Sequence, residues 1–207
     1  MDQYIVKVLA TEYLTLKVNR FVLEKPAGYN YIPGQATDVA INKPGWETEL
    51  RPFTFTSLHN AGHLEFMIKI YTGHNGVTEQ LAAVKPGDEL IIHEVFGAIN
   101  YKGPGIFIAG GAGITPFVAI LRQLKADNAL AGNTLLFANR TEKDIILKDE
   151  LDALLGGNCH HIIDHPLDSA IPGRYIDGRL LERYLSKTAH YSICGPDKFI
   201  EKMIGYL

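Results

Sequence analysis

The chain is poor in cysteine, with only Cys159 and Cys194 among its 207 residues. Two cysteines cannot form a disulfide framework, and a plant-type iron–sulfur cluster would need four thiolates. The first residues also lack the basic stretch and apolar run of a secretory signal peptide. A reducing, cytoplasmic setting is therefore expected.

Long apolar runs and an excess of positive charge are missing as well. No stretch approaches the roughly 20 apolar residues of a membrane span. The formal net charge is −3, whereas nucleic-acid binding needs a basic surface. Residues 1–100 hold 8 Lys and Arg against 11 Asp and Glu, while residues 101–207 hold 12 of each. Most of the arginines fall in the second part, as expected if it binds a phosphorylated ligand.

The first hundred residues have the pattern of short strands separated by turns. Apolar residues alternate or cluster in four predicted strands, over 4–9, 13–18, 64–70 and 90–93. Gly and Pro punctuate the connections, and one helix is expected near 77–84. Short strands with such turns favour an antiparallel barrel or sandwich.

The pattern changes at the Tyr-Lys-Gly-Pro-Gly segment 101–105, which places a domain boundary between residues 1–100 and 101–207. Beyond it, buried-type strands alternate with amphipathic helices. Strands are predicted over 106–109, 134–138, 160–163 and 191–194, and helices over 116–126, 147–155 and 179–185. This alternation predicts an α/β domain with a parallel sheet covered by helices.

A glycine-rich segment, Gly-Gly-Ala-Gly-Ile-Thr-Pro at 110–116, follows the first of these strands. Ligands of open α/β sheets bind beyond the carboxyl ends of the strands. Glycines let the backbone approach a pyrophosphate, and the following helix N-terminus favours its charge. Pro116 suits the first helical turn, and Thr115 can cap the helix or contact phosphate. A tight turn without a ligand is the alternative.

The segment Arg-Pro-Phe-Thr-Phe-Thr-Ser at 51–57 lies in the strand-rich part. A flavin needs a flat apolar face, a hydrogen-bond donor for its N5 atom and a cation for its phosphates. Phe53, Thr54 and Arg51 have these properties. Alternation along an ideal strand puts Arg51 and Phe53 on one face and Thr54 on the other, so a local bend would be needed. The alternative is an edge strand with a solvated Arg51.

Together these segments resemble the ferredoxin–NADP reductase family. Residues 51–54 resemble its R-x-[Y/F]-[S/T] flavin motif, residues 110–116 its G-G-x-G-[I/V]-T-P nicotinamide turn, and residues 194–196 its C-G-P motif. The resemblance also includes Ala-Asn-Arg-Thr at 138–141 and runs in the same order along nearly the whole chain. It implies an antiparallel Greek-key β-barrel that binds flavin, followed by an α/β parallel-sheet domain that binds NAD(P)H.

The resemblance also implies roles for the matching residues. In the barrel, Arg51 would hold flavin phosphate, Phe53 would pack on the ring system and Thr54 would hydrogen-bond near N5. The other implied flavin contacts of the barrel are Pro52, Ile68, Lys69, Ile70, Gly76, Val77 and Thr78. In the second domain Cys194 would help to position the nicotinamide. The other implied nucleotide contacts are Gly111, Gly113, Thr115, Pro116, Arg140, Gly195 and Pro196. Thr54 and Cys194 are thus the predicted catalytic residues.

Some features lie outside these motifs or depart from them. The family's G-P-x-G-x-F turn keeps only its second glycine, as Gly97, in the segment 94–99, so FAD is favoured but FMN stays open. Tyr206 could stack on the flavin or cap the last helix, and Trp46 could cover the flavin or lie exposed in a loop. No metal is predicted, because the neighbours His160 and His161 point to opposite faces of a strand. The polar residues considered for that metal site were Cys159, His160, His161, Asp164 and His165.

The implied activity is hydride transfer from NAD(P)H to bound FAD, followed by electron transfer to a separate acceptor such as flavodoxin, ferredoxin or a small molecule. Arg140, placed just after a strand, favours NADPH because it could bind a 2′-phosphate. Two alternatives stay open: a non-catalytic electron-transfer subunit of a larger complex, and a flavin-free binding module.

Overall fold

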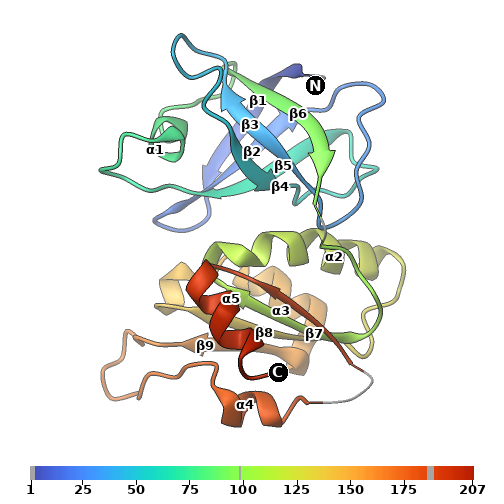
Figure 1. Ribbon diagram of the computed structural model, residues 1–207, viewed down its shortest axis with the longest axis vertical. Coiled ribbons are helices and arrows are strands. Elements are labelled where there is room, and N and C mark those ends of the chain that lie inside the picture. The colour runs from blue at the N-terminus through green and yellow to red at the C-terminus, as the bar shows by residue number, and fades with distance from the viewer. Residues whose placement is uncertain (1–2, 98, 186–188) are drawn as a thin grey trace. The chain divides into compact units, whose positions relative to one another are not determined.

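The computed structural model describes residues 3–97, 99–185 and 189–207, and Ala98 of the segment 94–99 lies outside the described residues. The chain forms two compact units, Met1–Asn100 and Tyr101–Leu207. Each unit has its own sheet and its own buried core (Figure 1).

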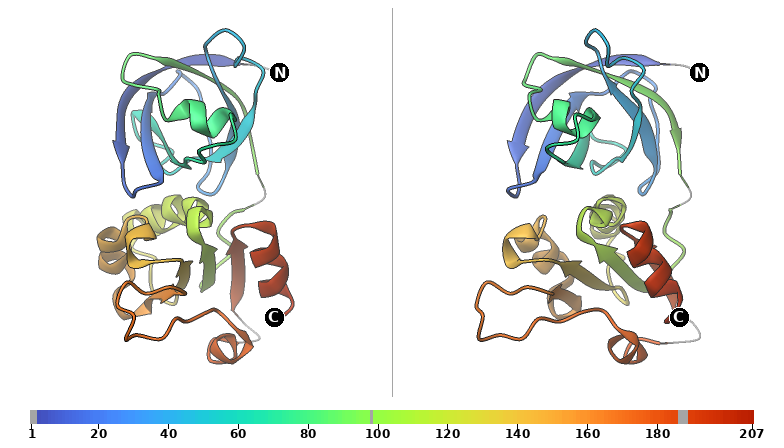
Figure 2. Two further views of the ribbon diagram at one scale, coloured as in Figure 1. Left: turned by 90° about the vertical axis from the view of Figure 1, so that its left-hand side faces the viewer. Right: turned by 60° about the vertical axis from the view of Figure 1, so that its left-hand side comes forward.

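The N-terminal unit is an antiparallel sheet that closes on itself (Figure 2). Its strands are β1 (Tyr4–Tyr13), β2 (Val18–Glu24), β3 (Ala36–Ile41), β4 (Arg51–Thr54), β5 (His63–Lys69) and β6 (Glu89–Phe96). They lie in the order β4-β3-β6-β1-β2-β5, and every pairing is antiparallel. Just past β4, the Thr56 amide donates to the Glu65 carbonyl of β5 at 2.9 Å, which joins the two ends of that order. The predicted Greek-key barrel is confirmed.

The barrel core holds the segment that follows β4. Phe55 is fully buried, and its ring stacks on Tyr31 with centroids 4.1 Å apart. The Tyr31 hydroxyl lies 2.7 Å from the Ser57 hydroxyl, and the Tyr29 hydroxyl donates to the His93 carbonyl at 2.7 Å. Both phenols are therefore buried with hydrogen-bond partners, and burial raises the pKa of Tyr29 to about 12. This packing anchors the strand that carries the predicted flavin motif.

The predicted strand over residues 13–18 is wrong. Strand β1 runs on through Tyr13, the chain turns over 14–17, and β2 starts at Val18. The Leu14 amide donates to the Val18 carbonyl at 2.9 Å, and the Thr15 hydroxyl accepts from the Val18 amide at 3.1 Å. These bonds close a hairpin tip in which Leu16 is 83% exposed. Residues 13–18 therefore alternate in polarity like a strand although residues 14–17 form a turn.

The C-terminal unit has a parallel sheet with helices on both faces (Figures 1 and 2). Strands β7 (Gly105–Gly110), β8 (Thr134–Asn139), β9 (Cys159–Ile163) and β10 (His190–Cys194) lie in the order β10-β7-β8-β9. The helices are α2 (Thr115–Ala126), α3 (Lys148–Leu155), α4 (Gly178–Glu182) and α5 (Asp197–Ile204). Phe107 packs on Phe117 of α2 on one face, while Ile108 belongs to the core that includes Leu181 of α4 and Met203 of α5. The predicted α/β domain is confirmed.

Helix α1 (Val77–Leu81) is the one described α-helix of the barrel unit and buries Val77 and Leu81 in its core. No described helix combines the length and apolar character that a membrane crossing needs.

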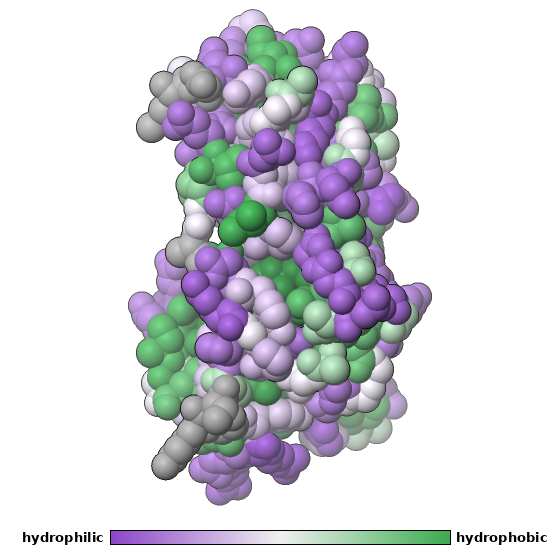
Figure 3. Space-filling model, turned by 90° about the vertical axis from the view of Figure 1, so that its right-hand side faces the viewer, coloured by the Kyte–Doolittle hydropathy of each residue, from purple (hydrophilic) through white to green (hydrophobic). Residues whose placement is uncertain are grey.

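The face in Figure 3 shows hydrophobic residues interspersed with polar ones.

Asn133 connects the start of β7 to the loop before β8. Its side chain is fully buried: Oδ1 accepts from the Gly105 amide at 3.2 Å, and Nδ2 donates to the Leu130 carbonyl at 3.1 Å and the Tyr101 hydroxyl at 3.2 Å. A buried backbone amide would lose its partner without this side chain.

Asn133→Ala is expected to lower the free energy of unfolding of the C-terminal unit by about 2–3 kcal/mol, because several buried polar groups lose their partner. Urea unfolding followed by circular dichroism measures the change. Asn158→Ala, at an exposed position, is the matched control. Equal effects of the two substitutions would contradict the proposed role of Asn133.

Candidate functional site

The glycine segment forms a single tight turn at the carboxyl end of β7. Gly111–Ile114 make one turn of 3-10 helix and α2 begins at Thr115. Gly111 has a φ of 52°, a left-handed conformation that favours glycine. The Thr115 hydroxyl donates to the Ala112 carbonyl at 3.1 Å, so this hydroxyl stabilises the turn itself. Pro116 lies in the first turn of α2, where it needs no amide hydrogen.

Two motifs about 80 residues apart in the sequence meet at this turn. Strands β7 and β10 are neighbours, with Ala109 paired to Cys194. A Cβ atom on Gly113 would lie 2.3 Å from the Cys194 carbonyl oxygen, and one on Gly195 would lie 2.7 Å from the Phe199 ring. No larger residue fits at position 113, because its neighbours there are backbone atoms, and one at position 195 would need the Phe199 ring to move. The structure therefore brings segments 110–116 and 194–196, which were each expected to contact the nucleotide, into direct contact with one another.

Cys194 lies at the end of β10 and is partly exposed. Burial raises the pKa of its thiol, and a hydrogen bond with the Gly195 backbone offsets part of this rise. The thiol is therefore neutral near pH 7. A neutral thiol is a poor nucleophile, so the structure does not present Cys194 as an activated thiol.

Sequence reasoning missed Asn139, the last residue of β8. Its side chain is 7% exposed, and neither its Oδ1 nor its Nδ2 has a hydrogen-bond partner within the described part of the chain. It lies one residue beyond Ala138, the partner of Gly110 in the sheet, and hence at the same carboxyl edge as the glycine turn. Its position at the end of a buried strand was the signal available in the sequence. Arg140, the next residue, is exposed.

The predicted flavin motif forms β4, which pairs with β3 on one side only. Arg51 is exposed: its Nη1 donates to the Leu50 carbonyl at 2.6 Å and its Nη2 lies 3.9 Å from a Glu49 carboxylate oxygen. Pro52 is exposed too, whereas Phe53 and Thr54 are half-buried. Exposure therefore does not alternate along β4 as in an ideal strand. Phe53 packs on the barrel core, with its ring 6.5 Å from that of Phe66.

The other predicted flavin contacts differ in what they expose. Ile68 and Ile70 are 1% and 6% exposed in the barrel core, so they offer a ligand only their backbone. Lys69 lies between them, partly exposed, with its Nζ 5.2 Å from the centre of the Tyr71 ring. The structure thus provides a cation and an aromatic ring on the solvent side of this segment.

The turn before α1 is organised by a carboxylate. Glu79 accepts hydrogen bonds from the amides of Gly73, His74 and Asn75 at 2.9, 3.1 and 2.7 Å, which lower its pKa. Val77 is buried, while Gly76 and Thr78 are partly exposed. Of the three predicted contacts, Gly76 therefore offers solvent its backbone, and Thr78 offers its side chain as well.

The remaining candidates are Tyr206, Trp46 and the residues weighed for a metal site. Tyr206 packs in its own unit, with a ring atom 3.5 Å from the position of a Cβ on Gly178, and Trp46 packs partly buried on the barrel core. The residues considered for a metal do not gather as one group. His160 lies near Tyr184, with ring centroids 5.6 Å apart. The Nδ1 atom of His165 lies 3.0 Å from Oδ1 of Asp164. Cys159 and His161 instead meet Asp152 of α3.

Family models match nearly the whole chain. The model described as the oxidoreductase FAD-binding domain matches residues 6–101, and that of the oxidoreductase NAD-binding domain matches residues 107–204. A solved ferredoxin NADP+ reductase from Neisseria gonorrhoeae, with bound FAD and NADP, has the same fold. Its TM-score is 0.85 at 18% identity, over 100% of this chain and 90% of that one. The chain therefore belongs to the ferredoxin–NADP reductase-like family of FAD- and NAD(P)-binding oxidoreductases.

Two curated relatives extend this comparison. The plasma membrane-associated coenzyme Q6 reductase PGA3 of Saccharomyces cerevisiae is 32% identical, over 95% of this chain and 65% of its own length. The NADH-cytochrome b5 reductase 2 of Mycosarcoma maydis is 28% identical, over 89% of this chain and 59% of its own length. This chain thus spans less than two thirds of either relative.

The described residues fit both cofactors of the family. At the carboxyl edge of the parallel sheet, Asn139 supplies a buried side-chain amide with no hydrogen-bond partner among the described residues. Beside it, Gly111 has no side chain that would keep a ligand away from the backbone of the turn. In the barrel, β4 has one free edge, with the half-buried Phe53 and Thr54 next to an exposed arginine.

Asn139→Leu is expected to weaken nicotinamide nucleotide binding about 5- to 10-fold, while the free protein stays as stable or gains about 1 kcal/mol. The reason is that leucine removes an unpaired buried amide without leaving a cavity. Nucleotide titration and urea unfolding measure the two effects. A loss of stability with unchanged affinity would show that Asn139 is purely structural.

Proposed function

We propose that the protein takes a hydride from NAD(P)H onto bound FAD and passes the electrons to a separate acceptor. The observation that carries this proposal is the packing of the 110–116 turn on the 194–196 segment, at the carboxyl edge of a parallel sheet. When both are bound, the nicotinamide supplies the hydride and the flavin accepts it and releases electrons one or two at a time.

The barrel residues would bind and orient the flavin. Arg51 is exposed, and among the described residues it is bonded to its neighbours Leu50 and Glu49, so its guanidinium can turn to a phosphate. The Thr54 hydroxyl would donate a hydrogen bond to the flavin N5, and the ring of Phe53 would give the flavin an apolar surface. Lys69 and Gly76 would complete the polar side of the site with backbone and side-chain donors.

The residues of the parallel sheet would bind and orient the nucleotide. The N-terminus of α2 and the turn at Gly111 would favour a pyrophosphate through the helix dipole and the close approach that glycine allows, since the Thr115 amide already donates to the Ala112 carbonyl. Asn139 would hydrogen-bond the nucleotide, while the neutral thiol of Cys194 would fix the nicotinamide plane without attacking it. The protein's contribution is thus positioning and exclusion of water.

A small electron-carrier protein is the proposed acceptor. Two relatives are named NADH-cytochrome b5 reductases, which supports a haem protein as the carrier. The likeness to a solved ferredoxin reductase concerns the fold alone. Flavodoxin and ferredoxin are the other carriers to compare, and a quinone is suggested by the name of the yeast relative. A cytoplasmic setting is part of the proposal, supported by two free cysteines.

Arg51→Ala is expected to weaken FAD binding about 10- to 100-fold, because a charge-assisted hydrogen bond to phosphate is lost. Titration of flavin-stripped protein with FAD, followed by fluorescence quenching, measures the affinity. Arg20→Ala is the matched control, since Arg20 pairs with Glu12 elsewhere on the barrel. Unchanged FAD affinity in Arg51→Ala would remove the proposed phosphate contact.

Arg140→Gln is expected to lower kcat/KM for NADPH about tenfold and to leave that for NADH within about twofold, because only NADPH carries a 2′-phosphate. Steady-state reduction of ferricyanide with each nucleotide gives both values. Arg179→Gln, on α4, is the control. An equal fall in kcat/KM with NADH and NADPH would mean that Arg140 contacts a part of the nucleotide common to both, not the 2′-phosphate.

Anaerobic mixing of the flavin-loaded protein with NADH or NADPH tests the function as a whole. The flavin absorption is expected to bleach, and reoxidation by cytochrome b5, ferredoxin or flavodoxin then ranks the acceptors by rate. A flavin band that neither nucleotide bleaches would instead favour a relay subunit. Failure to bind FAD or FMN would leave a binding module and overturn the proposal.

A further inference from the structure

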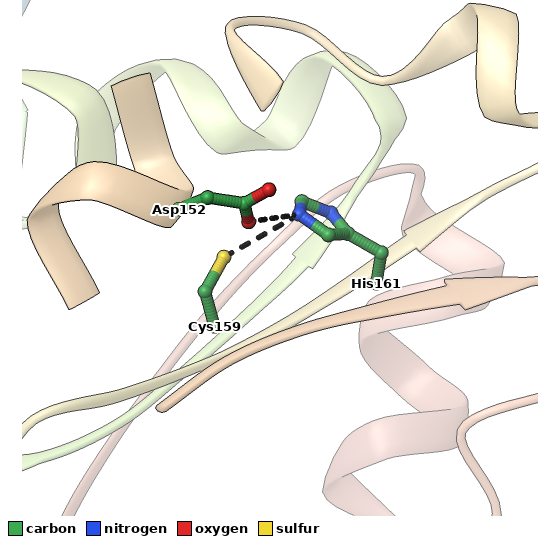
Figure 4. Close-up of side chains that lie close together, drawn as sticks. All are labelled: Asp152, Cys159 and His161. Atoms are coloured by element: carbon green, nitrogen blue, oxygen red, sulfur yellow. Dashed lines mark hydrogen bonds and ion pairs between the residues drawn. The ribbon is translucent and has the colours of Figure 1, made fainter. Parts of the chain in front are cut away.

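A cluster of metal-ligating side chains lies away from the nucleotide turn. Asp152 of α3 and Cys159 and His161 of β9 place one carboxylate oxygen, one sulfur and one ring nitrogen within 4.8 Å of one another (Figure 4). We refer to these three residues as the α3–β9 cluster. All three point toward one another and are half-buried, and the His161 side chain is 14% exposed.

The spacing of the cluster follows from the strand. Cys159 and His161 are two residues apart in β9, so their side chains lie on the same face. His160, between them, faces away toward Tyr184. His160 and His161 therefore point to opposite faces of β9 and do not face one common ion. Cys159 and His161 share a face, and Asp152 of α3 lies close to both.

The cluster contains the residues of a nucleophilic triad without its geometry. In a triad, one ring nitrogen of histidine contacts the nucleophile and the other contacts the carboxylate. Here the same atom, His161 Nε2, lies 2.7 Å from Asp152 Oδ1 and 3.6 Å from Cys159 Sγ. Burial also raises the pKa of the Cys159 thiol to about 12, so the thiol is not an activated nucleophile.

The distances suit a tetrahedral ion. Zinc bonds of about 2.3 Å to sulfur and 2.0–2.1 Å to nitrogen, at a tetrahedral angle, place the two ligand atoms about 3.6 Å apart. Sγ and Nε2 already have this separation. The nitrogen-to-oxygen distance must open to about 3.4 Å, a small movement of the aspartate.

Neighbouring groups hold two of the ligands in place. The Lys148 ammonium binds the second carboxylate oxygen, Asp152 Oδ2, at 2.6 Å, so Oδ1 is the oxygen turned to the cluster. The Phe137 ring lies 6.1 Å from the His161 ring and packs beside it. Such supporting contacts orient metal ligands in known sites.

We propose that the α3–β9 cluster binds a zinc-like divalent ion through Asp152 Oδ1, Cys159 Sγ and His161 Nε2, with water in the fourth position. On binding, the Cys159 thiol loses its proton to solvent, and neutral His161 carries its one ring proton on Nδ1, which leaves Nε2 free for the ion. Cys159 pairs with Leu135 at the amino end of the sheet, whereas the glycine turn follows its carboxyl end. The ion would therefore join α3 to the edge strand β9 and take no part in nucleotide binding.

Cobalt is the probe for this site, since Co²⁺ replaces zinc in tetrahedral sites and a bound thiolate gives it a charge-transfer absorption. The flavin-loaded full chain is treated with a chelator, dialysed and titrated with Co²⁺, and the spectrum of the metal-free sample is subtracted. One equivalent of Co²⁺ is expected to produce the thiolate band and the visible bands of tetrahedral cobalt. Zinc added afterwards should remove them.

Variants separate a built site from surface binding. Cys159→Ser should abolish the thiolate band, Asp152→Asn should weaken Co²⁺ binding at least about tenfold, and His160→Gln should change neither. Circular dichroism and FAD absorbance verify folding, and Asp152→Asn carries the test if Cys159→Ser does not fold. Absence of the thiolate band in the unmodified chain, or equal Co²⁺ affinity in Asp152→Asn, would overturn the proposal. Flavin reduction is not measured, so failure here leaves the proposed function untouched.

Discussion

The contact of Gly113 with the backbone of Cys194 and Gly195 is the constraint on which the nucleotide-binding unit depends. A Cβ at position 113 would lie 2.3 Å from a carbonyl oxygen, well inside the contact distance of any side chain. Glycine is therefore required for packing, whether or not a ligand is present. The same close approach aligns the end of β10 with the end of β7, so the thiol of Cys194 and the first amides of α2 lie at one edge.

The same glycines thus have two physical reasons to be there. The sequence predicts that they form a surface for pyrophosphate, with a ligand-free turn as the alternative. The structure adds a second cause, the close approach of two chain segments about 80 residues apart in sequence. A Gly113 variant that loses nucleotide binding would consequently say little about direct contact. The Asn139 amide has no hydrogen-bond partner among the described residues, so its replacement breaks no hydrogen bond of the free protein that the structure shows.

How much could be predicted differs between the two units. The parallel strands β7 and β8 are nearly continuous apolar runs because both faces are covered, and such runs are easy to find in a sequence. The barrel is harder, since residues 13–18 alternate although they form the hairpin tip, whereas strand Val18–Glu24 itself does not alternate. Motif positions were predictable. Asn139 lies in the resembling segment 138–141, but a sequence does not show that its amide is buried without a partner. Asp152 meets Cys159 and His161 only because α3 folds onto β9.

The order of the strands also has a consequence for synthesis of the chain. The barrel pairs strands from the first hundred residues only, so it has all its partners once β6 has emerged from the ribosome. In the second unit, by contrast, β7 lies between β8 and β10, and β10 comes some 80 residues after β7. Until then β7 has an unpaired edge, and such edges favour misassembly and recruit chaperones. Of the two units, the nucleotide-binding one therefore faces the longer exposure during translation.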